Sequence, residues 1–218
     1  MTLVFDPEQH AYFLDEVRIP SVTQIIQRQF LIEREHEVLI LPFSPKEYML
    51  KIGREDWDLA CNFGTAVHTA TEYDDHGILN EASLDTPLVP YLEAWRKFKS
   101  DTRCEILSIE EQGFSEKYKF GFTLDRIVRI RKLPNPRTCV AVLDIKSGDH
   151  AHLSARIQTA GYQAAYNEVR KAGRAVQRLS VNLFKDGNYR VHWWDDPTDW
   201  PAFLGCLTLY NWFQANHK

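Results

Sequence analysis

The stretch Val140-Ala141-Val142-Leu143-Asp144-Ile145-Lys146 is an apolar run that ends with an acid and a lysine on either side of one isoleucine. A short apolar run predicts a buried β-strand. Side chains two positions apart on a strand share a face, so Asp144 and Lys146 should point the same way. A carboxylate can bind Mg²⁺ or Mn²⁺, while an adjacent ammonium can position or deprotonate a water and offset charge on a phosphate. Taken by itself, the pattern is also that of a surface ion pair.

On the preceding expected strand, Gly121-Phe122-Thr123-Leu124-Asp125 supplies a second acid. Adjacent antiparallel strands lie about 5 Å apart, so Asp125 and Asp144 can share a cation if the strands are in register. Two carboxylates this close would repel each other without a metal. The alternative is that Asp125 pairs with its neighbour Arg126.

Two expected helices carry further candidates. Gly64-Thr65-Ala66-Val67-His68 offers a neutral imidazole as a ligand, with Glu72 one helical turn later on the same face. The alternative is a half-buried histidine that hydrogen-bonds to Glu72. After Lys146, Gln158 and Tyr162 stand four residues apart and share one face of the next helix. Ordinary helix packing is the alternative for this pair.

The order of the expected elements predicts an α/β protein with a central mixed β-sheet flanked by α-helices. In the N-terminal part, the hydrophobic periods and turn residues predict a hairpin at 3–5 and 11–14, a helix from Ser21 to about Arg28 with a Ser21–Gln24 capping box, a helix within 44–76 and a helix at 90–100. The middle part is predicted to form strands at 106–109, 120–130 and 139–146, with a turn at 134–136. The C-terminal part is predicted to form a helix from Ser154 to about Lys171 ended by Gly173, strands at 176–184 and 189–194, and a helix from about Pro197 to Ala215.

Taken together, the motifs occur in the order G-x-x-x-H, G-x-x-x-D, D-x-K and Q-x-x-x-Y. This set resembles the RecB-like nucleases of the PD-(D/E)XK superfamily over roughly residues 60–170, and the start at 20–23 is similar to phage-encoded members. The resemblance implies a restriction-endonuclease-like core. It also implies that His68, Asp125 and Asp144 bind one or two Mg²⁺ or Mn²⁺ ions, that Lys146 acts on the water and the phosphate, and that Gln158 and Tyr162 support the active site and the DNA.

Two further ligand positions follow from the proposed mechanism and from the resemblance. The backbone carbonyl of Ile145 is expected to add a ligand. Many members of the family carry a glutamate on the strand before the G-x-x-x-D element, where Glu110 and Glu111 both qualify here. We favour Glu111, and we include Glu72 as a second supporting acid.

The length and the composition, with 44% hydrophobic and 26% charged residues, predict a single domain over residues 1–218, and the resemblance implies that it is a nuclease domain. Its expected parts are a hairpin and helices in 1–60, a catalytic core at about 60–195 and a C-terminal helix at 197–215. The apolar runs support neither a signal peptide nor a membrane span, so we expect a cytoplasmic protein of a bacterium or a phage-infected cell. The four dispersed cysteines predict reduced thiols. The CRISPR-associated subgroup of the resembled family holds an iron–sulfur cluster with three cysteines near the C-terminus, where this chain has Cys206 alone, so we expect no iron–sulfur cluster.

The net charge of -4 is unevenly spread along the chain. Residues 55–95 contain nine acids and no lysine or arginine, whereas 117–137 contain seven basic residues and one acid. Basic clusters attract phosphate, although a mixed solvated surface gives similar counts. The side chains that we expect to contact the DNA backbone are Arg126, Arg129, Arg131, Lys132 and Arg156, and Trp193 or Trp194 could stack on bases unless buried.

The sequence therefore predicts a metal-dependent DNA nuclease, favoured as an exonuclease of phage-type recombination, replication or repair. A single-strand-annealing or single-strand-binding protein is the expected partner, on the resemblance alone. One alternative is a non-catalytic DNA-binding or interaction module that keeps the same fold. The other is a buried ion network that has no role in catalysis.

Overall fold

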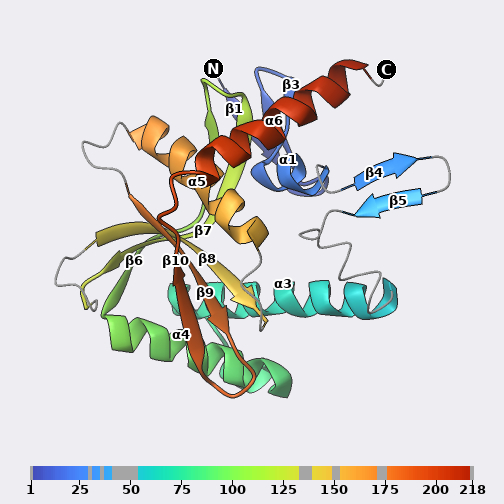
Figure 1. Cartoon of the computed structure of the whole chain (residues 1–218). Coiled ribbons are helices and arrows are strands. Elements are labelled where there is room, and N and C mark those ends of the chain that lie inside the picture. Colours follow the sequence, from blue (N-terminus) through green and yellow to red (C-terminus); the bar gives the residue numbers. More distant parts are fainter. Residues whose placement is uncertain are drawn as a thin grey trace.

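The computed structural model describes residues 2–28, 31–34, 37–40, 54–132, 139–148, 153–170 and 176–216. At its centre is a five-stranded sheet in the order β10-β9-β8-β7-β6 (Figure 1). The strands are β6 (Cys104–Ser115), β7 (Phe120–Ile130), β8 (Cys139–Ser147), β9 (Gln177–Leu183) and β10 (Tyr189–Trp193). The pair β8–β9 is parallel because helix α5 (Leu153–Arg170) crosses between them, and the other pairs are antiparallel. The predicted mixed sheet is confirmed.

Helices cover both faces of this sheet (Figure 1). On one face lie α1 (Val22–Arg28), α5 and α6 (Asp199–Asn216), and on the other lie α3 (Arg54–His76) and α4 (Val89–Thr102). The first face has a core that includes Phe120, Leu124 and Phe203. The second has a separate core around Trp95 and Phe98, both fully buried. Two short 3-10 helices, η1 (Glu81–Ser83) and η2 (Thr86–Leu88), connect α3 to α4.

The N-terminal segment forms a small sheet of its own, β1-β2-β3, with strands β1 (Leu3–Asp6), β2 (Ala11–Leu14) and β3 (Val17–Ile19). It is attached to β7, because the Gly121 N–H donates to the Pro20 carbonyl at 2.8 Å. The Tyr12 ring lies so close to Gly121 that a Cβ there would come within 2.4 Å of it. A glycine is therefore required where the two sheets meet.

The start of α1 confirms the predicted capping box. The Gln24 N–H donates to Ser21 Oγ at 3.1 Å, and the Ser21 N–H donates to Gln24 Oε1 at 3.2 Å. These reciprocal bonds satisfy two backbone groups that a helix start leaves open. They fix the position of Thr23, which lies between the two residues and lines the cavity described below.

Several predicted boundaries change in the structure. The helix expected within 44–76 is described from Arg54, and residues 41–53 lie outside the described part. Residues 1–60 were expected to contain one hairpin and helices, but they also contain β3 and a second hairpin, β4 (Leu31–Arg34) and β5 (Glu37–Ile40). The strand expected at 106–109 extends over twelve residues because it pairs with the full length of β7. Ser154, expected as a cap, is the second residue of α5, and the turn at 134–136 and Gly173 lie outside the described residues.

Within the described residues, none of the helices combines the length and the apolar composition that crossing a membrane requires. The final helix α6 begins at Asp199 rather than near Pro197. Its first residue is buried and ion-paired with Arg156 and Arg178, so α6 is tied to α5 and β9 at its start.

Candidate metal centre

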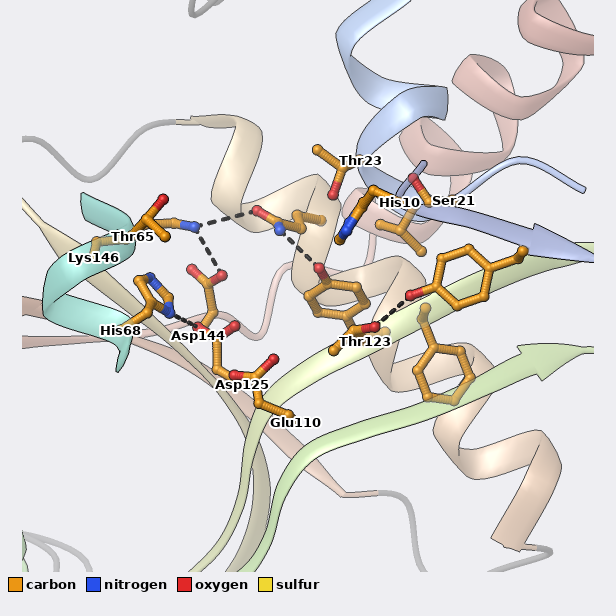
Figure 2. A pocket seen from close by; sticks show the side chains of 15 residues that line it. His10, Ser21, Thr23, Thr65, His68, Glu110, Thr123, Asp125, Asp144 and Lys146 are labelled. Atoms are coloured by element: carbon orange, nitrogen blue, oxygen red, sulfur yellow. Dashed lines mark hydrogen bonds and ion pairs between the residues drawn. The ribbon is translucent and has the colours of Figure 1, made fainter. Parts of the chain in front are cut away.

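The six residues that the motifs single out line one cavity of about 420 Å³. Its floor is formed by β7 and β8, and α3, α5 and the N-terminal segment form its walls (Figure 2). His68 comes from α3, Asp125 from β7, Asp144 and Lys146 from β8, and Gln158 and Tyr162 from α5. Residues separated by up to 94 positions in the sequence thus line the same cavity.

The antiparallel ladder between β7 and β8 explains why the two aspartates meet. Its last pair is Arg126 with Leu143, so the next position along the strands sets Asp125 opposite Asp144. Asp125 Oδ2 accepts a hydrogen bond from the Ile145 N–H at 2.7 Å and lies 3.6 Å from His68 Nδ1. The backbone of Ile145 thus orients Asp125, and ligation by the Ile145 carbonyl stays a prediction.

Asp144 and Lys146 are ion-paired, but not at the surface. Lys146 Nζ lies 2.8 Å from Asp144 Oδ1, and the Asp144 side chain is 2% exposed while that of Lys146 is 31% exposed. Burial raises the pKa of Asp144, and the Asp125 carboxylate raises it further against the opposing effect of Lys146. Burial by itself would lower the pKa of Lys146, but the two carboxylates raise it. The lysine is therefore a cation aimed into the cavity.

Glu110 lines the cavity, although the sequence-based expectation favours its neighbour Glu111. The β6–β7 register shifts between Ile106 and Ser108, which leaves Leu107 as an extra residue in β6. Further along the ladder, Ile109 pairs with Arg126 and Glu111 with Leu124, so Glu110 lies opposite Asp125. Its φ of 47° lies in the left-handed region, which costs a non-glycine residue roughly 1 kcal/mol or more.

The preference for Glu111 is therefore corrected. Successive side chains of a strand point to opposite faces, so only one of the two glutamates can enter the cavity. Glu110 lines it, whereas Glu111 accepts a 3.0 Å ion pair from Arg170 of α5. Nothing local in the sequence marks the bulge that decides between them.

One ligand atom each from His68, Glu110 and Asp125 can be chosen so that all three lie within 4.8 Å of one another. Burial raises the pKa of Glu110 to about 7, and the Asp125 carboxylate adds to the rise. Crowded carboxylates beside an imidazole are a donor set that a divalent cation would relieve of repulsion, and oxygen donors with one imidazole suit Mg²⁺ or Mn²⁺. These three residues fit the expected metal.

Glu72 does not contribute in the way that the sequence suggested. It is on α3 with His68, but its carboxylate lies 4.0 Å from His76 Nε2, and it is not among the residues that line the cavity. His68 faces Asp125 instead of Glu72 (Figure 2). The role of Glu72 as a supporting acid is therefore limited to its charge, which raises the pKa of Glu110 slightly.

Gln158 and Tyr162 connect the lysine to the N-terminal segment. Gln158 Oε1 lies 3.5 Å from Lys146 Nζ, and Gln158 Nε2 donates to the Tyr162 hydroxyl at 2.8 Å. Tyr162 also shares a hydrogen bond with the Thr23 side chain, and burial and the two aspartates raise its pKa. The tyrosine is therefore a neutral hydroxyl in the cavity wall.

The arginines expected to contact DNA are engaged by acids. The prediction for Arg126 is wrong, because its side chain is fully buried and its Nε donates to Asp75 Oδ2 at 2.7 Å. Arg126 contacts Asp125 through the backbone carbonyl of that residue and not through its carboxylate, so the alternative of an Asp125–Arg126 ion pair is not found either. The other three are partly exposed but paired: Arg129 and Arg131 with Glu105, and Arg156 with Asp196 and Asp199.

The two tryptophans differ. Trp193 is 37% exposed, whereas Trp194 donates from Nε1 to Ser180 Oγ at 2.9 Å and stacks on His192. Ser180 in turn lies 3.4 Å from Asp144 Oδ2. Trp194 is therefore tied to the wall behind Asp144.

Comparisons with known proteins do not identify a family or a function for this chain. Neither a scan of known protein families nor a search of curated proteins found a match. A solved structure titled "Crystal structure of SSO0001" aligns over 65% of this chain and 67% of its own, with 14% sequence identity and a TM-score of 0.33. A likeness at this level carries no argument about fold or function.

Proposed function

We propose that this protein is a DNA nuclease that hydrolyses phosphodiester bonds with Mg²⁺ or Mn²⁺. The observation that carries the proposal is the meeting of His68, Glu110 and Asp125 beside the Asp144–Lys146 pair in one cavity. A non-catalytic binding module would need neither a cluster of metal ligands nor a lysine held against a buried carboxylate. The restriction-endonuclease-like core is part of this proposal and rests on the resemblance of the motifs.

His68, Glu110 and Asp125 would hold the cation, with Asp144 opposite Asp125 as a further carboxylate. When bound, a divalent cation lowers the pKa of water and polarises the phosphate. The Ile145 N–H keeps one oxygen of Asp125 in place, which leaves the other free to act as a ligand. The buried setting of Asp144 strengthens its electrostatic interactions.

Lys146 is better suited to donating than to accepting a proton. Its pKa is raised, so its ammonium stays charged at neutral pH. An ammonium in this position orients the attacking water and offsets the negative charge that builds on the phosphate. Gln158 keeps the lysine directed into the cavity through its amide oxygen.

The substrate class follows from the same resemblance, and one observation is consistent with it. The arginines that were expected to contact DNA are paired with acids, and Lys146 is the one lysine or arginine among the described residues that line the cavity, so attraction of phosphate within the cavity would fall to Lys146 and the cation. We propose an exonuclease over an endonuclease, acting in phage-type recombination, replication or repair. An annealing or single-strand-binding partner stays a prediction.

The test compares linear and closed circular DNA in Mg²⁺, Mn²⁺ or EDTA, using the native protein and the variants Lys146→Ala and Lys185→Ala. Lys185 is exposed at a hairpin turn and does not line the cavity, so its variant is the matched control. Metal-dependent loss of linear DNA alone, abolished in Lys146→Ala but not in Lys185→Ala, would support an exonuclease. Cleavage of the closed circles would support an endonuclease. DNA binding without cleavage in any metal would favour the non-catalytic module, and the absence of metal binding would favour a structural ion network.

A further inference from the structure

The cavity has a second end that the proposed hydrolysis does not use. Beyond the carboxylates and Tyr162, its lining consists of hydroxyl, imidazole and aromatic groups and the aliphatic Val22 (Figure 2). His10, Tyr12, Ser21 and Thr23 come from the N-terminal segment, and Thr123 comes from β7. None of these side chains is an acid, so this end, called the hydroxyl end below, differs chemically from the end that holds His68, Glu110 and Asp125.

The hydroxyl end is held firmly to the sheet. The hydroxyls of Tyr12 and Thr123 hydrogen-bond to each other, and the Tyr12 ring is 1% exposed against Gly121. Burial raises the pKa of Tyr12, so its hydroxyl stays neutral. A rigid set of neutral donors and acceptors is suited to polar, uncharged groups such as a sugar and the edge of a base.

The two ends are joined by a continuous polar wall. Hydrogen bonds run from Lys146 through Gln158 to Tyr162, and from Tyr162 to Thr23. A phosphate placed at Lys146 would therefore have its attached nucleoside directed along this wall. The volume of about 420 Å³ is at the lower end of ligand pockets, which suits one nucleotide instead of a length of duplex.

We infer that the hydroxyl end binds the unpaired nucleoside next to the scissile phosphate, so that the enzyme acts on single-stranded DNA or on a frayed end. This inference rests on the proposed nuclease function. A base inside the cavity cannot stay paired with a complementary strand, and leaving a duplex costs a few kcal/mol of pairing and stacking. Single-stranded substrates avoid that cost.

His10 offers the cleanest test of this subsite. It lies in the turn between β1 and β2, is exposed, and its ring makes an edge-to-face contact with Phe5. His10→Ala removes this contact, so thermal unfolding is measured for this variant too. His76→Ala removes an exposed histidine that does not line the cavity and is the matched control. Thr123→Val, which removes one hydroxyl at nearly constant shape, is a second variant, with thermal unfolding as the check on its fold.

The first experiment measures binding of thymidine monophosphate and of inorganic phosphate by calorimetry in Mn²⁺. We expect the nucleotide to bind at least about tenfold more tightly than phosphate, and His10→Ala to weaken only the nucleotide, by about tenfold. Equal affinities for both probes, or an unchanged nucleotide affinity in both variants, would overturn the subsite. Failure of both probes to bind would count instead against the metal centre and the nuclease function.

The second experiment compares hydrolysis of an oligothymidylate with that of a blunt hairpin duplex of equal length. We expect the single strand to be cleaved at least about tenfold faster, and His10→Ala to raise KM for the single strand more than it lowers kcat. Equal rates on the two substrates would overturn the inference while leaving the nuclease function standing.

Discussion

Arg126 Nε lies 2.7 Å from Asp75 Oδ2, and both side chains are fully buried. Asp75 is on α3, seven residues after His68 and therefore on the same helical face, whereas Arg126 follows Asp125 on β7. Arg126 also donates to the Asp125 carbonyl at 2.6 Å and lies 3.4 Å from Glu110. The Arg126–Asp75 ion pair thus joins α3, which carries His68, to β7, which carries Asp125, and Arg126 also links β7 to Glu110 on β6.

Breaking this pair should destabilise the protein strongly. In Asp75→Asn the buried guanidinium loses its nearest charge partner, and Lys99, whose Nζ lies 2.6 Å from Asp75 Oδ1, loses one too. Removal of one member of a buried pair costs roughly 3–5 kcal/mol. We expect urea unfolding to show a loss of this size. The control is Glu105→Gln, at the exposed pairs with Arg129 and Arg131, which should change stability very little. A loss of stability in Asp75→Asn as small as that in Glu105→Gln would show that other groups compensate the charge of Arg126.

The bulge in β6 makes a prediction about two adjacent glutamates. Glu110→Gln removes a charged ligand from the cluster with His68 and Asp125, so the affinity for Mn²⁺ should fall by about tenfold or more. Glu111→Gln alters a side chain that pairs with Arg170 outside the cavity, and its Mn²⁺ affinity should match that of the native protein. Calorimetric titration of both variants decides the matter, and a larger loss in Glu111→Gln would reverse the assignment.

The sequence predicts those parts of the site in which reactive side chains lie at a spacing that fixes their relative direction. The D-x-K pattern fixes Asp144 and Lys146 on one face of a strand, and the short connection from the preceding strand makes antiparallel pairing with Asp125 the natural outcome. The helical spacing places Gln158 and Tyr162 together for the same reason. These are local consequences of backbone geometry.

The remaining features depend on contacts between distant parts of the chain. A single extra residue at Leu107 decides whether Glu110 or Glu111 enters the cavity, and a pattern of alternating side chains does not reveal where the register shifts. The burial of Arg126 depends on an acid 51 positions away, so the sequence alone predicts a surface charge at this position. Likewise, nothing in residues 10–23 indicates that they form one end of the cavity.

Glu110 should give the metal-free protein a characteristic pH dependence. Its pKa rises from 4.5 to about 7 on folding, because of burial and then of Asp125. Between these values the folded state binds more protons than the unfolded state, so the free energy of unfolding should fall as the pH rises across this window. Thermal unfolding in EDTA from pH 4.5 to 7.5 should show a steeper decline for the native protein than for Glu110→Gln.

The comparison of slopes removes the contribution of Asp144. The pKa of Asp144 is also raised, so it acts in the same direction, but it is present in both proteins. Adding Mn²⁺ should oppose the decline in the native protein, because a cation binds the deprotonated carboxylate and stabilises the folded state. Parallel slopes in EDTA would indicate that Glu110 titrates near its ordinary value.

Two helical glycines should respond oppositely to alanine. A Cβ at Gly161 on α5 would lie 2.7 Å from the ring of Phe203, which is fully buried, so the α5–α6 contact must shift and stability should fall by roughly 1–3 kcal/mol. At Gly205 on α6 a Cβ meets nothing within 4 Å, so alanine should stabilise the helix by up to about 1 kcal/mol. Urea unfolding of both variants measures the difference. If Gly161→Ala were as stable as Gly205→Ala, α6 would not be packed on α5 as closely as the contact between Gly161 and the Phe203 ring requires.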